Sequence, residues 1–114
     1  MWRRPALILV LLASCSKQPQ SDLQYIADAR SAAAEWALVN EQANQGKLTP
    51  TYVESMHRWL RQQLETDTGA LSEPNATYAA EMNALLQQRD DAEPSVLRPH
   101  ADRLKQIEDA LESA

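Results

Sequence analysis

The sequence is poor in the residue types that build sheets, disulfide frameworks and phosphate-binding loops. It has no phenylalanine, two glycines and one cysteine, and its β-branched residues are few. A single thiol cannot form a disulfide within the chain, so the fold must be stable without one. CxxC and CxxCH patterns are missing, which excludes zinc ribbons, thioredoxin-like redox sites and covalently attached c-type haem. No glycine-rich phosphate loop is present either.

Catalytic and metal-binding patterns are also missing. No serine stands in a GxSxG setting and no HExxH motif is present; Glu54 and His57 have ExxH spacing, but there is no second ExxH to form the pairs that di-iron bundles need. The two histidines, His57 and His100, have too few other ligands near them at helical spacing, so both are expected at the surface. The acidic pairs Asp90-Asp91 and Glu108-Asp109 are expected to be solvated, at a turn and on a polar helix face. The sequence therefore predicts no catalytic residue, no metal and no cofactor.

The residues that are abundant favour helices. Alanine, leucine, glutamine, glutamate and arginine dominate the 114 residues, of which 44% are hydrophobic and 24% charged. This balance predicts one folded helical domain. Sixteen acidic side chains against eleven basic ones give a formal net charge of −5. Nucleic acid phosphates repel such a surface, so no nucleic acid partner is expected.

The N-terminus has the layout of a secretory signal peptide. Arg3 and Arg4 precede an apolar run over residues 6–13. A membrane-spanning helix needs roughly 20 apolar residues, so this run is too short to cross a bilayer. It is also apolar on every side, which argues against a helix buried in a domain core. We therefore interpret this segment as a signal that is removed from the mature protein.

The apolar run ends in Leu12, Ala13, Ser14 and Cys15. This ending resembles the lipobox of bacterial lipoproteins, in which a leucine and two small residues precede the cysteine. The resemblance implies that the Cys15 thiol receives a diacylglyceryl group, that a peptidase cleaves before Cys15, and that the new amino group is often acylated. Each buried methylene contributes about 0.8 kcal/mol, so two or three acyl chains hold a protein stably at a membrane. The alternative is an ordinary cleaved signal peptide and a free Cys15 thiol.

The resemblance divides the chain into three parts. Residues 1–14 are the signal peptide, residues 15–21 carry the lipidated cysteine and a flexible polar tether, and residues 22–114 form the domain. Ser16 follows Cys15. In enteric bacteria an aspartate at this position resembles an inner-membrane retention signal. The absence of that aspartate favours the outer membrane, with the domain facing the periplasm. Removal of two arginines with the signal leaves nine basic and sixteen acidic side chains, or 9 − 16 = −7.

Residues 22–114 predict an all-α fold, a small antiparallel bundle of three to four helices. Apolar residues recur at helical spacing over residues 22–45 and 50–66, in a shorter helix between residues 75 and 90, and in a last helix. Gly46 is expected as a left-handed C-cap and Thr49 as an N-cap. Ser95 is the expected cap of the last helix, and Pro99 limits that helix: either the helix begins at Pro99 or its first turn is irregular.

The two tryptophans of the domain allow two interpretations. Trp36 and Trp59 stand beside apolar neighbours, so packing between the first two helices is the simpler one. The other is a partly exposed aromatic patch, with Arg58 or Arg61 nearby, that binds a partner protein, because tryptophan and arginine dominate interface energetics. The sequence does not decide between them.

These features favour a non-catalytic envelope lipoprotein. It would be held at the membrane by lipid on Cys15 and would act as an interaction, accessory or structural module for another envelope protein. The alternative is a periplasmic carrier of a small apolar ligand, since alanine-rich helices leave space between them. An enzyme is a third interpretation, which would require a pocket that joins a histidine to several carboxylates.

Overall fold

The computed structural model describes residues 19–114, so the predicted signal peptide, the lipobox and Cys15 lie outside the described residues. It contains the 3-10 helix η2 (Pro19–Asp22) and the α-helices α1 (Leu23–Asn44), α2 (Pro50–Gly69), α3 (Thr77–Leu86) and α4 (Pro94–Glu112). These elements confirm the predicted small all-α bundle. Within residues 19–114, no helix is long and apolar enough to cross a membrane.

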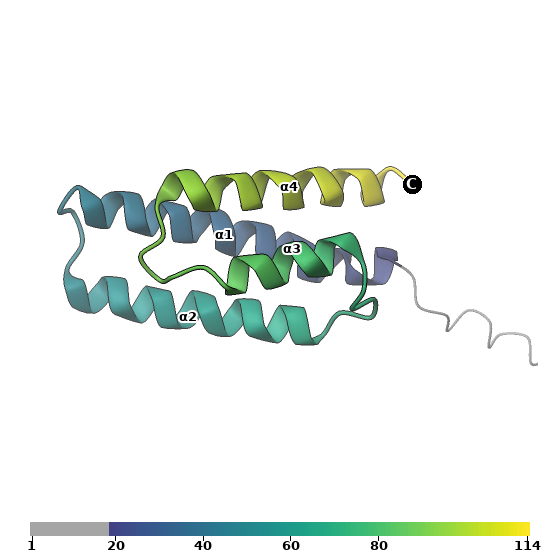
Figure 1. Ribbon diagram of the computed structural model, residues 1–114, viewed down its shortest axis with the longest axis horizontal. Helices are drawn as coiled ribbons and strands as arrows, with labels where there is room; N and C mark the ends of the chain where they lie inside the picture. Colours follow the sequence, from purple (N-terminus) through teal and green to yellow (C-terminus); the bar gives the residue numbers. More distant parts are fainter. Residues whose placement is uncertain (1–18) are drawn as a thin grey trace, which may run out of the picture.

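Consecutive helices of the bundle run in opposite directions (Figure 1). α1 is the central helix: α4 packs along it most extensively, α2 lies beside it, and α3 joins α2 to α4. The start of α1, the α2–α3 loop (residues 70–76) and the C-terminus lie at one end, which we call the tether end (Figure 1). The α1–α2 turn (residues 45–49) lies at the opposite, far end.

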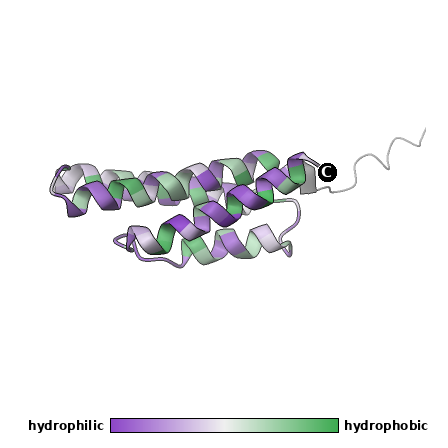
Figure 2. Ribbon diagram, turned by 90° about the horizontal axis from the view of Figure 1, so that it is seen from above, coloured by the Kyte–Doolittle hydropathy of each residue, from purple (hydrophilic) through white to green (hydrophobic). Residues whose placement is uncertain are grey.

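Each helix buries one side and exposes the other, so hydrophobic and hydrophilic residues alternate around it (Figure 2). The core of α1 is rich in alanine, and its buried apolar residues are Ile26, Ala29, Ala32, Ala33, Trp36, Ala37 and Val39. Leu97, Ala101 and Leu104 form the matching core of α4. Small side chains allow two helix backbones to approach closely, which is why α4 packs along so much of α1.

The turn between α1 and α2 has the predicted caps. Gly46 adopts a φ of +71°, a left-handed conformation that glycine tolerates best. The Gly46 N–H donates to the Ala43 carbonyl at 3.0 Å. The Thr49 hydroxyl accepts from the Tyr52 N–H at 3.2 Å, with Pro50 as the first helical residue. Both capping predictions are confirmed.

Three boundaries differ from the predicted ones. The last three residues of the predicted tether, 19–21, belong to η2. α2 continues to Gly69, three residues beyond Thr66. α4 begins at Pro94 and contains Pro99 in its interior, so Ser95 is not its cap. Pro99 donates no backbone hydrogen bond; burial of the α4 core against α1 offsets this loss, because tertiary packing stabilises most helices in proteins.

Candidate functional site

The α3–α4 loop (residues 87–93) is held by side chains of α1. Trp36 Nε1 donates to the Asp90 carbonyl at 2.8 Å. Asn40 Nδ2 donates to the same carbonyl at 3.0 Å and to that of Ala92 at 2.7 Å. Because α3 has only ten residues, this loop continues along the bundle where α3 ends (Figure 1).

Arg61 of α2 secures the same loop. Its guanidinium donates to the carbonyls of Leu86 and Gln88, both at 2.9 Å, and to the Asp90 carboxylate at 2.7 Å. The guanidinium carbon also lies 5.3 Å from the centroid of the Trp36 ring, a cation–π distance. Two of the four residues of the predicted partner patch, Trp36 and Arg61, are therefore engaged within the protein.

Trp59 and Arg58 differ from them. Trp36 is 2% exposed, which confirms its predicted place in the core, whereas Trp59 is 52% exposed, so the core interpretation is wrong for Trp59. Arg58 is exposed as well. Successive helical residues point about 100° apart. Because the side chain of Leu60 points into the core, the side chain of the preceding residue, Trp59, points toward solvent.

The expectation that both histidines lie at the surface is wrong. His100 is 7% exposed, and its Nδ1 lies 2.5 Å from the carboxylate of Glu81 on α3, to which Arg103 also donates at 3.0 Å. Burial raises the pKa of Glu81, but the hydrogen bonds from Arg103 and His100 outweigh burial and lower it. His57 is half-buried and its Nε2 lies 2.7 Å from Asn40 Oδ1. Across residues 19–114, no cluster of three or more His, Cys, Asp or Glu side chains could hold a metal ion.

One of the acidic residues that we expected to be solvated is buried. Glu108 is 8% exposed and accepts from Arg30 Nε at 2.8 Å and from Nη2 at 3.4 Å. This pair joins α4 to α1. The arginine lies 78 residues earlier in the chain, and no local pattern reveals such a partner. Asp91 and Asp109 are exposed, as expected.

Asp22, at the start of α1, is buried and fully hydrogen-bonded. It is 1% exposed and accepts from the Ser72 N–H at 2.8 Å, the Ser72 hydroxyl at 2.9 Å, the Glu73 N–H at 3.2 Å and the Tyr78 hydroxyl at 2.6 Å. Burial raises the pKa of Asp22, but these hydrogen bonds outweigh burial and lower it. We call Asp22, Ser72, Glu73 and Tyr78 the Asp22 clamp; it ties the start of α1 to the α2–α3 loop and α3.

Asp67, near the end of α2, is buried without such partners. Its exposure is 6%, and Oδ2 has no hydrogen-bond partner among the described residues. Burial, and then the nearby Asp28 carboxylate on α1, raise the pKa of Asp67 to about 6. Asp67 lines a surface hollow of about 360 Å³. Its lining residues are Trp59, Gln62, Gln63, Thr66 and Asp67, and we call it the Trp59 hollow.

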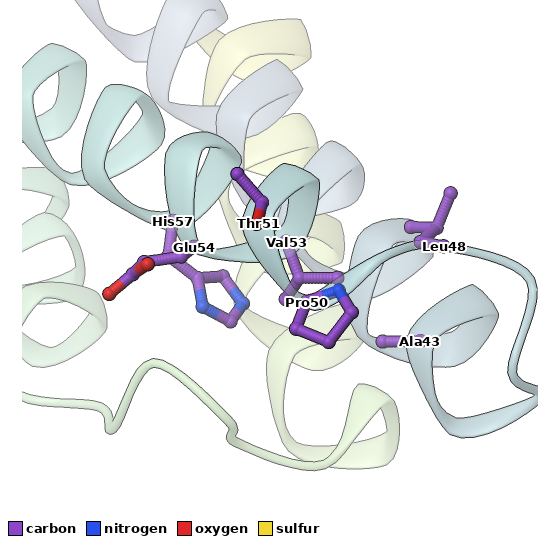
Figure 3. Close-up of a pocket in the computed structure, with 7 residues that line it drawn as sticks. All are labelled: Ala43, Leu48, Pro50, Thr51, Val53, Glu54 and His57. Atoms are coloured by element: carbon purple, nitrogen blue, oxygen red, sulfur yellow. The ribbon is translucent and has the colours of Figure 1, made fainter.

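A second hollow, of about 510 Å³, lies where α1 ends and α2 begins, and we call it the far-end hollow (Figure 3). Its lining residues are Ala43, Leu48, Pro50, Thr51, Val53, Glu54 and His57. Glu54 and His57 are its titratable side chains, and Asn40 holds the ring of His57. The lining of the far-end hollow thus mixes apolar side chains with the carboxylate of Glu54 and the imidazole of His57.

The sequence did not single out Asp22 or Asp67 as site residues. Asp22 was placed at the start of a helix, where aspartate is a common cap, but its side chain makes no cap hydrogen bond. Asp67 fell just past the predicted end of α2. A longer second helix would have placed Asp67 seven residues after Leu60, on the buried side, and that placement is the one local signal that could have revealed it.

Known proteins give no template for this surface. No family model, curated protein sequence or solved structure matches this chain. Trp59 and Asp67 are candidates on two observations: the exposure of a large indole, and a buried carboxylate oxygen that has no hydrogen-bond partner within residues 19–114.

Proposed function

We propose that this protein is a lipoprotein of a bacterial cell envelope whose helical domain binds another envelope protein. Lipid on Cys15 would hold it at the membrane, facing the periplasm, at the outer membrane rather than the inner one. The domain would act as an interaction or accessory module, with no catalytic step and no cofactor. A net charge of −7 after residue 14 fits a protein partner better than nucleic acid.

The exposure of aromatic side chains on α2 carries the proposal. Trp59 is 52% exposed and Tyr52 is 49% exposed. They are seven residues apart, two turns of the helix, and so lie on the same side of α2. Tryptophan and tyrosine are enriched at protein interfaces, because each buries a large rigid surface when a partner covers it.

Neighbouring features extend this aromatic face. Trp59 also lines the Trp59 hollow, together with Gln62, Gln63, Thr66 and Asp67. On α1, Leu38 is 48% exposed. It lies at the level of Trp59, because Asn40 pairs with His57 and the two helices are antiparallel. A partner that covered this side of α2 would remove several large apolar groups from water.

The anchor is tested by intact mass and membrane partition of the mature protein. We expect wild type to begin at Cys15, to carry added acyl mass and to stay with membranes, whereas Cys15→Ala does neither. A soluble wild-type protein with a free thiol would overturn the anchor and leave a diffusible binding protein.

The interaction is tested by photocrosslinking in living cells. A photoreactive residue at position 59 should capture one specific envelope protein, while the same residue at Gln106, exposed on α4, should not. Equal capture at both positions, or none at position 59 with the protein abundant, would contradict the proposal. If the protein instead retained a small apolar molecule in native mass spectrometry and captured no partner, the far-end hollow would be a carrier site.

A further inference from the structure

The Trp59 hollow combines two features that are uncommon in folded proteins. A carboxylate oxygen of Asp67 is buried without a hydrogen-bond partner in residues 19–114, and such a group costs stability. An indole half exposed to water lines the same hollow. The other buried acidic side chains, Asp22 and Glu108, both have partners.

The lining residues form a track along α2. Trp59, Gln63 and Asp67 are spaced four residues apart, so they lie along one ridge of the helix, with about 6 Å for each step. Helical side chains lean toward the N-terminus, which brings the Asp67 carboxylate toward Gln63 and Trp59. An elongated group could therefore lie on the indole at one end and reach the carboxylate at the other.

The charge that acts on Asp67 from α1 is negative, whereas Arg58 and Arg61 lie beyond Gln62 and line a neighbouring hollow. Asp28 of α1 lies close enough to Asp67 to act on its carboxyl group. Glu35 follows Asp28 by seven residues and so lies on the same side of α1. No lysine or arginine lines the Trp59 hollow. A ligand in this hollow would bind more tightly if it carried a positive charge at the Asp67 end and apolar surface at the Trp59 end.

We propose that the Trp59 hollow binds a guanidinium or alkylammonium cation, with its charged head beside Asp67 and its hydrocarbon stem on Trp59. A bound cation offsets the Asp67 charge that burial leaves uncompensated, and charge-assisted hydrogen bonds to a carboxylate are stronger than neutral ones. The indole attracts both the stem and the charge, the latter by a cation–π interaction. Gln62, Gln63 and Thr66 supply polar atoms around the head.

An arginine or lysine side chain of the partner protein is the source that we favour, and this choice of source rests on the proposed function. A free polyamine carries the same chemistry. Binding of either cation requires the ionised Asp67 carboxylate, so the affinity should increase as the pH rises through about 6.

The experiment uses the isotope-labelled protein purified from its own host and titrated at pH 7 with N-acetyl-arginine N-methylamide. The matched control is the citrulline analogue, which has nearly the same shape and no charge. We expect saturable shifts of the Trp59 indole N–H and the Asp67 carboxyl carbon at millimolar concentrations, with the citrulline analogue at least about tenfold weaker. Asp67→Asn and Trp59→Ala should abolish saturation, while Asp102→Asn, on the exposed side of α4, should not.

The outcomes separate this inference from the proposed function. Equal binding of the two analogues, or unchanged binding by a folded Asp67→Asn variant, overturns the cation site. If position 59 still captures a partner protein in that case, the proposed function survives. If the arginine analogue binds as expected but no partner is captured, the cation site is supported and its source is a free molecule. Titration with spermidine then measures that source directly.

Discussion

Asp22 and Asp67 both lie buried near the tether end of the bundle, but among residues 19–114 the Asp22 carboxylate has four donors, whereas Oδ2 of Asp67 has none. Four donors surround the Asp22 carboxylate, and its pKa is lowered. The Asp67 carboxylate has an unpaired oxygen and a nearby like charge, and its pKa is raised to about 6. Both side chains are buried, so the difference comes from the donors around Asp22 and, for Asp67, from the nearby Asp28 charge.

The comparison separates a structural carboxylate from a candidate binding one. Asp22 stabilises the fold in its charged form because its partners replace the water it has lost. Asp67 loses water without replacement, so its charged form destabilises the fold until a ligand supplies the donor. A protein retains such a group at a cost in stability, which is why we assign Asp67 to binding and Asp22 to folding.

Removing the Asp22 carboxylate should have the largest effect on stability. Asp22→Ala leaves the N–H groups of Ser72 and Glu73 and the Tyr78 hydroxyl without their acceptor. We expect the free energy of unfolding at pH 7 to fall by about 3 kcal/mol, measured by urea denaturation. Asp102→Ala is the control, because Asp102 is exposed. A loss below about 1 kcal/mol would mean that the clamp contributes little to stability.

Removing the Asp67 charge should change the free energy of unfolding in the opposite direction. Asp67→Asn keeps the shape of the side chain and abolishes the charge, so we expect it to stabilise the protein at pH 7 by about 1–2 kcal/mol. The same denaturation measurement checks this. Destabilisation by Asp67→Asn would show that the carboxylate has a partner that supports the fold.

The pH dependence of stability should reveal both aspartates. The folded-state pKa of Asp67, about 6, lies above its ordinary value of 3.8, so this group favours the folded state fully below pH 3.8, and that contribution is lost as the pH rises through 6. The pKa of Asp22 is lowered. Asp22 therefore stabilises the folded state above pH 3.8, and this stabilisation is lost as the pH falls below 3.8. Between pH 6 and 4, wild type should gain stability relative to Asp67→Asn. Parallel curves over that range would contradict the assignment.

Removing one donor from the clamp should have a smaller effect. Tyr78→Phe deletes the hydroxyl that donates to Asp22 at 2.6 Å and leaves three donors in place. We expect a loss of about 1 kcal/mol in the free energy of unfolding and a higher pKa for Asp22. Carbon-detected NMR titration of the carboxyl group measures that pKa. An unchanged value would mean that the tyrosine is not a significant donor.

Trp59→Ala should have the smallest effect on stability. The indole is half exposed, and surface substitutions away from the core usually change the free energy of unfolding by less than about 0.5 kcal/mol. Trp36→Ala is the matched comparison, because that indole is buried and donates to the Asp90 carbonyl. Large, equal losses in both variants would place Trp59 in the core and remove it from the candidate site.

Much of the fold was predictable because its signals are local. Helical periodicity, the cap at Thr49 and the left-handed Gly46 each depend on a few neighbouring residues. The boundaries that differed depend on tertiary contacts instead. Pro99 lies inside α4 because the buried residues on either side of it, Leu97 and Ala101, pack in the core.

The candidate site was only partly predictable, because it depends on which helices meet. Trp59 was one of the residues considered for a partner surface, but its neighbour Leu60, not the tryptophan, is buried. Arg61 could not be assigned to the α3–α4 loop, since its acceptors lie 25 to 29 residues later. Asp67 could not be predicted as a site residue, because its lack of donors within residues 19–114 depends on which groups α1 and α2 bring together.

The Asp22 clamp also determines how a mechanical pull would enter the domain. Tension on the chain before Pro19 reaches the bundle at η2, directly before the first turn of α1. Without the clamp, that turn would unwind first, because helix ends fray readily. The clamp passes part of the load to residues 72–78, so the start of α3 must give way together with the start of α1. If the protein is tethered through this segment, the starts of α1 and α3 would therefore share the load and resist stretching together.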